Sequence, residues 1–227
     1  MTDPVSERMR TQAEQWQSNG DRRAIFLNCY TLMTGNMLAA IDAGEFNDAD
    51  WVYSLLQHFA EYYFAALDAY EQGQQDIPPI WKLTFDTDNQ PGTLVAQNLM
   101  LGINAHINYD LTLALVDMLA PDWAQLSPDE RQGRYDDHTH VNWAIARTID
   151  AVQDTVVEPA SPAMNIIDVL MGPVDEWAVA RMISEWRDTV WEQAIRLMDA
   201  LDEGESQRLR QQYEVAALER ARLILRI

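Results

Sequence analysis

The sequence predicts an all-α fold, a single-domain helical bundle of about seven or eight helices over residues 1–227. Apolar residues recur every three to four positions in several long segments, as they do on the buried face of a helix. Proline, glycine and Asn-Asp pairs separate these segments. No alternation of apolar and polar residues is longer than four residues, whereas a half-buried strand needs such a pattern.

The first three helices are delimited by capping residues. Residues 5–17 are expected to form a peripheral N-terminal helix within about residues 1–20, ended by Asn19-Gly20. Asp21 is a suitable N-cap for a long helix that Gly44 ends. Asn47-Asp48 opens the next helix, which continues to about residue 72.

Residues 73–92 are expected to form the longest loop. The segment contains Pro78, Pro79 and Asn89, and no helical period is visible in it. It also contains Trp81 and Phe85, and large aromatic side chains in a loop usually pack over something. The loop is therefore interpreted either as a cover of the core or as a lid over a pocket.

The second half of the chain begins with the most apolar helix, from about residue 93 to residue 119. Ser127-Pro128 then starts a helix to about residue 157, with a possible kink at Gly133. A short helical piece is expected to end near Gly172, and Pro173 starts a long helix to residue 201. The final helix follows residues 203–205 and is rich in arginine and leucine.

Composition excludes several classes of partner. The formal net charge is −20, whereas nucleic acids and anionic membranes require a basic surface. Cys29 is the single cysteine, so no intramolecular disulfide can form. Neither a membrane span nor a secretion signal is evident, which leads to the expectation of a soluble cytoplasmic protein without a membrane span. The oligomeric state is not determined by the sequence.

The segment Gly102–Leu111 places polar residues inside the most apolar helix. On a helical wheel, Asn104 and Asn108 belong to a polar stripe. His106 and Asp110 lie one turn apart on the opposite, apolar side, and are expected to point inward. Gly102 leaves room beside them, either for a close helix crossing or for a bound molecule.

Two more charged residues lie on apolar helix faces. Asp137 is near the middle of an apolar arc, with His138 and His140 at its edges and Asp136 on the polar side. Arg187 is close to the centre of the apolar face of the long helix after Pro173. A buried guanidinium keeps its charge, so Arg187 is expected to pair with Asp110 or Asp137.

These residues predict a buried site of His106, Asp110, Asp137 and Arg187. Three hypotheses remain open. One is a divalent metal (Fe, Mn, Zn or Mg) held by His106, Asp110, Asp137 and His140. Another is metal-free acid–base chemistry, in which Asp110 orients His106 and Arg187 binds an anionic group of the substrate. The last is a salt-bridge network that only fixes helix packing.

The aromatic and methionine residues suggest a pocket for a lipophilic small molecule. The expected function is therefore an enzyme that acts on a small, largely apolar molecule. Its substrate would also contact Tyr30, Asn104, Asn108 and Trp191. One alternative is a non-catalytic helical module that binds a ligand or a partner. A further alternative, terpenoid-cyclase-like chemistry, depends on Asp136-Asp137, although no second metal motif accompanies that pair.

Four pieces of sequence resemble a helical family of bacterial proteins that is known only as a domain of unknown function. The most specific is the decapeptide Gly102–Leu111. The others are residues 59–64, Asp137 with Val141-Asn142, and residues 186–191. The resemblance implies that His106, Asp110, Asp137 and Arg187 are characteristic positions of the family, whereas His58, His138 and His140 are not. It implies no reaction.

Overall fold

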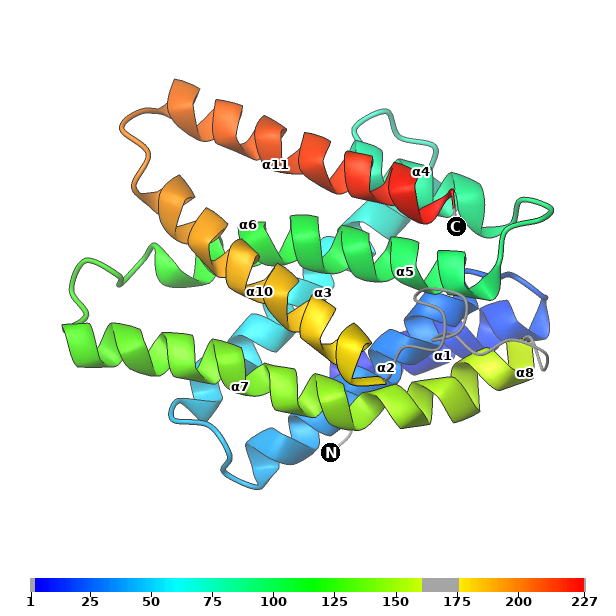
Figure 1. Ribbon diagram of the computed structural model, residues 1–227, viewed down its shortest axis with the longest axis horizontal. Helices are drawn as coiled ribbons and strands as arrows, with labels where there is room; N and C mark the ends of the chain where they lie inside the picture. Colours follow the sequence, from blue (N-terminus) through cyan, green and yellow to red (C-terminus); the bar gives the residue numbers. More distant parts are fainter. Residues whose placement is uncertain (1–2, 161–175, 227) are drawn as a thin grey trace.

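A rod of three consecutive elements runs through the middle of the molecule: α5 (Val95–Ala105), the π-helical turn η1 (His106–Asp110) and α6 (Leu111–Leu119). The computed structural model describes residues 3–160 and 176–226, and other helices pack around this rod (Figure 1). The rod is buried because its side chains are apolar nearly all round. The described residues form helices and no strand, which confirms the all-α prediction.

The N-terminal third contains α1 (Pro4–Ser18), α2 (Ala24–Asp42) and α3 (Ala49–Glu71). Asp3 and Asp48 cap α1 and α3 by accepting hydrogen bonds from backbone N–H groups of the first turn. α1 packs on α2 and buries Met9 and Trp16. The first helix therefore contributes one face to the core, while most of its other residues are exposed.

The expected loop at residues 73–92 contains a helix, α4 (Pro79–Asp88). Pro79 occupies the first helical position, where its missing N–H has no helical partner to lose. Trp81 and Phe85 lie one turn apart on the buried face of α4 and stack on each other. The loop prediction was wrong because a proline that starts a helix was interpreted as one that prevents it.

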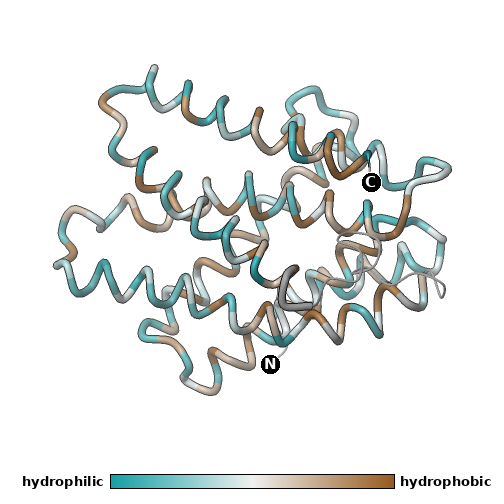
Figure 2. The backbone as a smooth tube through the Cα atoms, viewed as in Figure 1, coloured by the Kyte–Doolittle hydropathy of each residue, from teal (hydrophilic) through white to brown (hydrophobic). Residues whose placement is uncertain are grey.

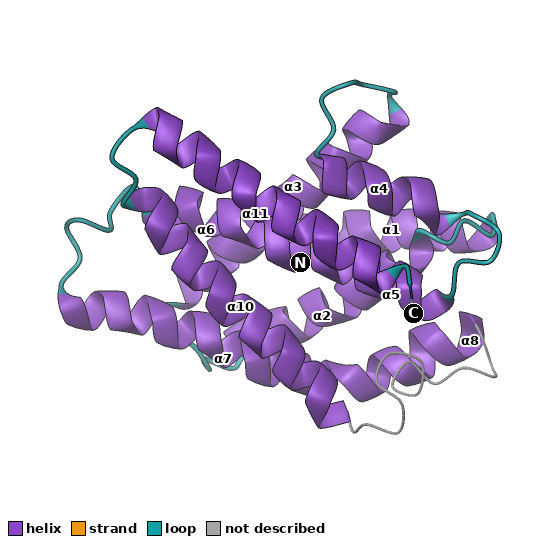
Figure 3. Ribbon diagram, turned by 45° about the horizontal axis from the view of Figure 1, so that its top comes forward, coloured by secondary structure: helices purple, strands orange, loops and turns teal. Residues whose placement is uncertain are grey.

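One continuous run of helical elements and one pair of helices complete the bundle. The first runs from α7 (Pro128–Val152), without a break at Gly133, through η2 (Gln153–Val157) to α8 (Glu158–Ala160). The other part is a pair of separate helices, α10 (Glu176–Met198) and α11 (Glu203–Ile224), which lie over the central rod (Figure 3). Hydrophilic residues dominate the N-terminal halves of α7 and α11 (Figure 2). The predicted helix boundaries at Gly172 and Pro173 lie outside the described residues.

α2 and α5 cross closely at Gly102. A Cβ at this position would lie 2.3 Å from Cγ of Phe26, far inside van der Waals contact. The absence of a side chain at Gly102 thus lets the Phe26 ring pack directly against the α5 backbone. Of the two roles expected for Gly102, the structure shows the close helix crossing.

Two helical stretches, Ala24–Asp42 and Val95–Leu119, are long and apolar enough to span a membrane by length and composition alone. This is weak evidence, because core helices of soluble proteins pass the same test. In the second stretch, 72% of the most apolar window is buried inside the bundle.

Candidate functional site

His106 and Asp110 form a buried hydrogen-bonded pair at the two ends of η1. Nδ1 of His106 lies 3.0 Å from Oδ2 of Asp110, and both residues are almost fully buried. The turn closes with a hydrogen bond from the Leu111 N–H to the His106 carbonyl, five residues apart. Such π-helical turns are rare and are frequently found at functional sites.

Trp81 holds the carboxyl group of Asp110 from the side of α4. Its indole Nε1–H donates to Oδ1 and Oδ2 of Asp110, at 2.9 and 3.0 Å. Burial raises the pKa of Asp110 well above its ordinary value and lowers the pKa of His106 well below its own. Both shifts favour the uncharged forms of the two side chains. In the uncharged pair, a protonated Asp110 would donate to Nδ1 of His106, and the imidazole would carry its own proton on Nε2.

Aromatic rings enclose the His106 imidazole. Phe59 stacks on it with ring centroids 3.6 Å apart, and Tyr30 approaches edge-on at 4.3 Å. Within the described part of the chain, neither Nε2 of His106 nor the Tyr30 hydroxyl has a hydrogen-bond partner, although both are buried. Buried polar atoms of native proteins are rarely left unpaired, so each of these two atoms is expected to have a water molecule or a bound molecule as its partner.

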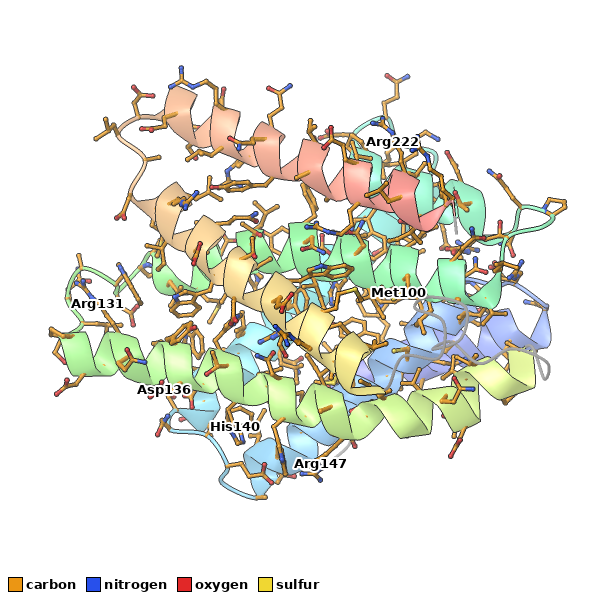
Figure 4. All side chains as sticks on the ribbon, viewed as in Figure 1. Met100, Arg131, Asp136, His140, Arg147 and Arg222 are labelled. Atoms are coloured by element: carbon orange, nitrogen blue, oxygen red, sulfur yellow. The ribbon has the colours of Figure 1, made fainter. Side chains whose placement is uncertain are left out.

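His106 and Tyr30 belong to the wall of a cavity of about 390 Å³. This volume is in the range of small-molecule sites, roughly 300–1,000 Å³. The wall is formed by residues of α2, α3, α5, η1, α7, η2 and α10. Most lining side chains are aliphatic, aromatic or methionine, such as Met100, which Figure 4 labels on α5. The polar and charged lining residues include Thr34, His106, Thr148, Gln153, Asp154 and Arg187.

Arg187 reaches the same cavity from α10 and is 5% exposed. Its Nε donates to Oδ1 of Asn142 at 2.8 Å, and Nη2 donates to the His138 carbonyl at 2.7 Å. Burial lowers the pKa of Arg187 to about 10, so the guanidinium stays protonated at neutral pH. No ion pair joins Arg187 to a carboxylate in the described structure, and the expected partners Asp110 and Asp137 lie elsewhere.

Asp137 is buried, as the helical wheel predicted, but it serves another part of the fold. Its Oδ1 accepts from the backbone N–H of Asn47 at 2.7 Å, and its Oδ2 accepts from that of Asp48 at 2.9 Å. Asp137 precedes His138 by one position, so it points about 100° away around α7. It therefore faces the start of α3, whereas its neighbour faces Arg187.

The four predicted metal ligands His106, Asp110, Asp137 and His140 do not converge. His140 lies on the side of α7 that faces the α2–α3 connection, 3.5 Å from Glu45 (Figure 4). Among the residues that the structure describes, no three His, Cys, Asp or Glu side chains are grouped to hold a metal ion. Asp136 is exposed, so the Asp136-Asp137 pair does not face the cavity as a cyclase motif would.

Three predicted substrate contacts have other partners. Nδ2 of Asn104 donates to the Ala217 carbonyl of α11 at 2.9 Å, and Asn108 donates to Asn104. Asn104 therefore joins the central rod to α11, and Asn108 holds the Asn104 amide oxygen. Trp191 packs against other rings, those of Trp123, Tyr135 and His138. Tyr30 alone among the four substrate contacts proposed lies in the described cavity wall.

A comparison with protein-family models matches residues 2–227 to one family. The chain belongs to the Family of unknown function (DUF5995). No curated protein and no solved structure is similar enough to count as a match. Membership confirms the expectation of an uncharacterised family.

Several residues of this candidate site could not be predicted from the sequence. Trp81 was assigned to a loop, and nothing in its local pattern indicates that it bonds Asp110 across the bundle. In the sequence, nothing distinguishes Phe59 from the other aromatic residues on apolar helix faces. His138 was placed at the edge of an apolar arc, yet it is 1% exposed and its Nε2 lies 3.1 Å from the Arg187 carbonyl. Asn142 lies one turn after His138, and that spacing was an available signal.

Proposed function

We propose that this protein is an enzyme that transfers a proton to or from a small, largely apolar molecule bound in the cavity. The observation that carries the proposal is that His106 lines an apolar cavity, with its Nδ1 held by Asp110 and its buried Nε2 without a partner among the described residues. An imidazole held by a carboxyl group at Nδ1 is a common arrangement for general acid–base catalysis.

The His106–Asp110 pair can both give a proton to the bound molecule and take one from it. In the uncharged pair, Nε2–H gives its proton to the bound molecule while the Asp110 proton moves to Nδ1. The products are the protonated ligand, a neutral imidazole with its proton on Nδ1, and the Asp110 carboxylate. That carboxylate is stabilised by the two hydrogen bonds from Trp81. The reverse transfer makes Nε2 a base and restores the uncharged pair.

The first test is occupancy of the cavity. The neutral apolar fluorophore N-phenyl-1-naphthylamine should bind to the wild-type protein with enhanced fluorescence. Ile145→Phe should weaken binding at least tenfold, because Ile145 belongs to the cavity wall and the larger ring fills the space. Thermal unfolding shows whether the variant is folded. A wild-type protein that binds no such probe would refute the proposal.

The second test measures proton transfer. In D₂O, NMR follows exchange of the α-hydrogens of 2-heptanone, a small apolar ketone. We expect the wild-type protein to accelerate exchange, and both His106→Gln and Asp110→Asn to abolish the acceleration. Asparagine can still donate to Nδ1 of His106 and accept from Trp81, but it cannot release the proton. Equal exchange rates in all three proteins, with probe binding intact, would instead favour a non-catalytic ligand-binding module.

A further inference from the structure

Arg187 is a buried cation whose contacts in the described structure are all with uncharged groups. Asn142 and the backbone carbonyl of His138 accept from it, and Nδ1 of His138 lies 3.3 Å from Nη2. Burial, together with the Arg187 charge, lowers the pKa of His138 well below its ordinary value, so His138 is neutral. An isolated charge in an apolar interior is costly unless an opposite charge compensates it.

The guanidinium also has unused donors. Arginine carries five N–H groups, and the described residues accept hydrogen bonds from Nε and Nη2 but not from Nη1. Asp154 lines the same cavity, but it is exposed and forms no ion pair with Arg187 in the described structure. Asp188, next in sequence, is exposed on α10 and only partly offsets the effect of burial on Arg187.

We infer that the ligand is a lipophilic monocarboxylic acid whose carboxylate binds Arg187. This inference rests on the proposed function, in that it takes the cavity to be the binding site. One negative charge matches one guanidinium, whereas a phosphate dianion would leave a negative charge uncompensated among apolar side chains. The aliphatic and aromatic wall accounts for the rest of the ligand. His106 would then act on another part of the same molecule.

The experiment compares two molecules that differ mainly in their head group. Decanoate and 1-decanol compete for bound N-phenyl-1-naphthylamine at neutral pH and fixed ionic strength. We expect the wild-type protein to bind decanoate at least tenfold more tightly than 1-decanol. Arg187→Met should abolish that preference and leave the affinity for 1-decanol within about threefold, because methionine keeps a similar unbranched chain without the charge.

Two further variants keep the test decisive. Arg196→Met should retain the preference for decanoate, since Arg196 is an exposed arginine of the same helix α10 and does not line the cavity. Arg187→Lys keeps the positive charge if Arg187→Met fails to fold, and it should retain a reduced preference. Equal affinities of the wild-type protein for decanoate and 1-decanol would overturn the inference and leave the cavity as a binding site. Absence of binding of the probe and both competitors, checked by calorimetry, would refute the proposed function as well.

Discussion

Asp137 accepts hydrogen bonds at both carboxylate oxygens from the start of α3. Asp137→Ala removes these acceptors and leaves two backbone N–H groups without their partner. We expect the free energy of unfolding to fall by about 1–3 kcal/mol, as measured by urea denaturation. The neighbouring Asp136→Ala is the control and should change it by less than about 0.5 kcal/mol, because Asp136 is exposed. The affinity of Asp137→Ala for the fluorescent probe should equal that of the wild-type protein. A loss of affinity in Asp137→Ala but not in Asp136→Ala would show that Asp137 contributes to ligand binding.

Asp88 makes stability depend on pH. The residue is 3% exposed at the end of α4, and burial raises its pKa to about 7, although Asn98 donates to its Oδ1. The folded protein therefore holds a proton that the unfolded chain releases near pH 4. Stability contributed by this proton is present below that pH and is lost as pH rises from about 4 to about 7.

The size of this effect is on the order of 4 kcal/mol, from the difference between pKa values of about 7 and 3.8. Asp88→Asn keeps an acceptor for Asn98 and carries no charge. We expect the variant to gain stability relative to wild type as pH rises from 4.5 to 7.5 in urea denaturation. Parallel pH profiles of the two proteins would show that Asp88 is ionised throughout this range.

At the scale of the elements, the crossing of α2 and α5 depends on Gly102. Gly102→Ala puts a methyl group into the Phe26 ring, and we expect a loss of about 1–3 kcal/mol in the free energy of unfolding. Adding Phe26→Leu should recover part of the loss. Gly35→Ala is the matched control, because Gly35 is also helical but has nothing within 4 Å. It should stabilise the protein by about 0.5–1 kcal/mol. Equal changes in the free energy of unfolding for Gly102→Ala and Gly35→Ala would contradict the close crossing of α2 and α5.

At the scale of the whole molecule, 36 acidic residues oppose 16 basic ones. Raising the salt concentration from 0.01 M to 0.15 M shortens the screening length from roughly 30 Å to 8 Å and weakens this self-repulsion. We expect the melting temperature in calorimetry to rise at pH 7.5. The increase should be smaller at pH 5, which is closer to the pI of about 4.3. An equal increase at both pH values would point to a salt effect unrelated to net charge.

The sequence predicts the helices better than it predicts how they meet. Periodicity placed His106, Asp110, Asp137 and Arg187 in the interior, and all four are buried. It could not assign partners, because a helical wheel gives a direction around one axis and contains nothing about neighbouring helices. Convergence of the four residues was therefore an assumption. Only His106 and Arg187 among them line the described cavity wall, and Asp110 reaches it through His106.

The π-helical turn at His106–Asp110 has a consequence for insertions and deletions. A turn closed by a bond between residues five apart contains one residue more than an α-helical turn, which closes over four. It is therefore equivalent to a one-residue insertion in an otherwise regular helix. Deleting one of residues 107–109 would let α5 continue into α6 with the flanking faces in phase, while changing the spacing of His106 and Asp110 from four residues to three. A single-residue deletion in η1 thus tests whether the spacing of this pair matters for the proposed proton transfer.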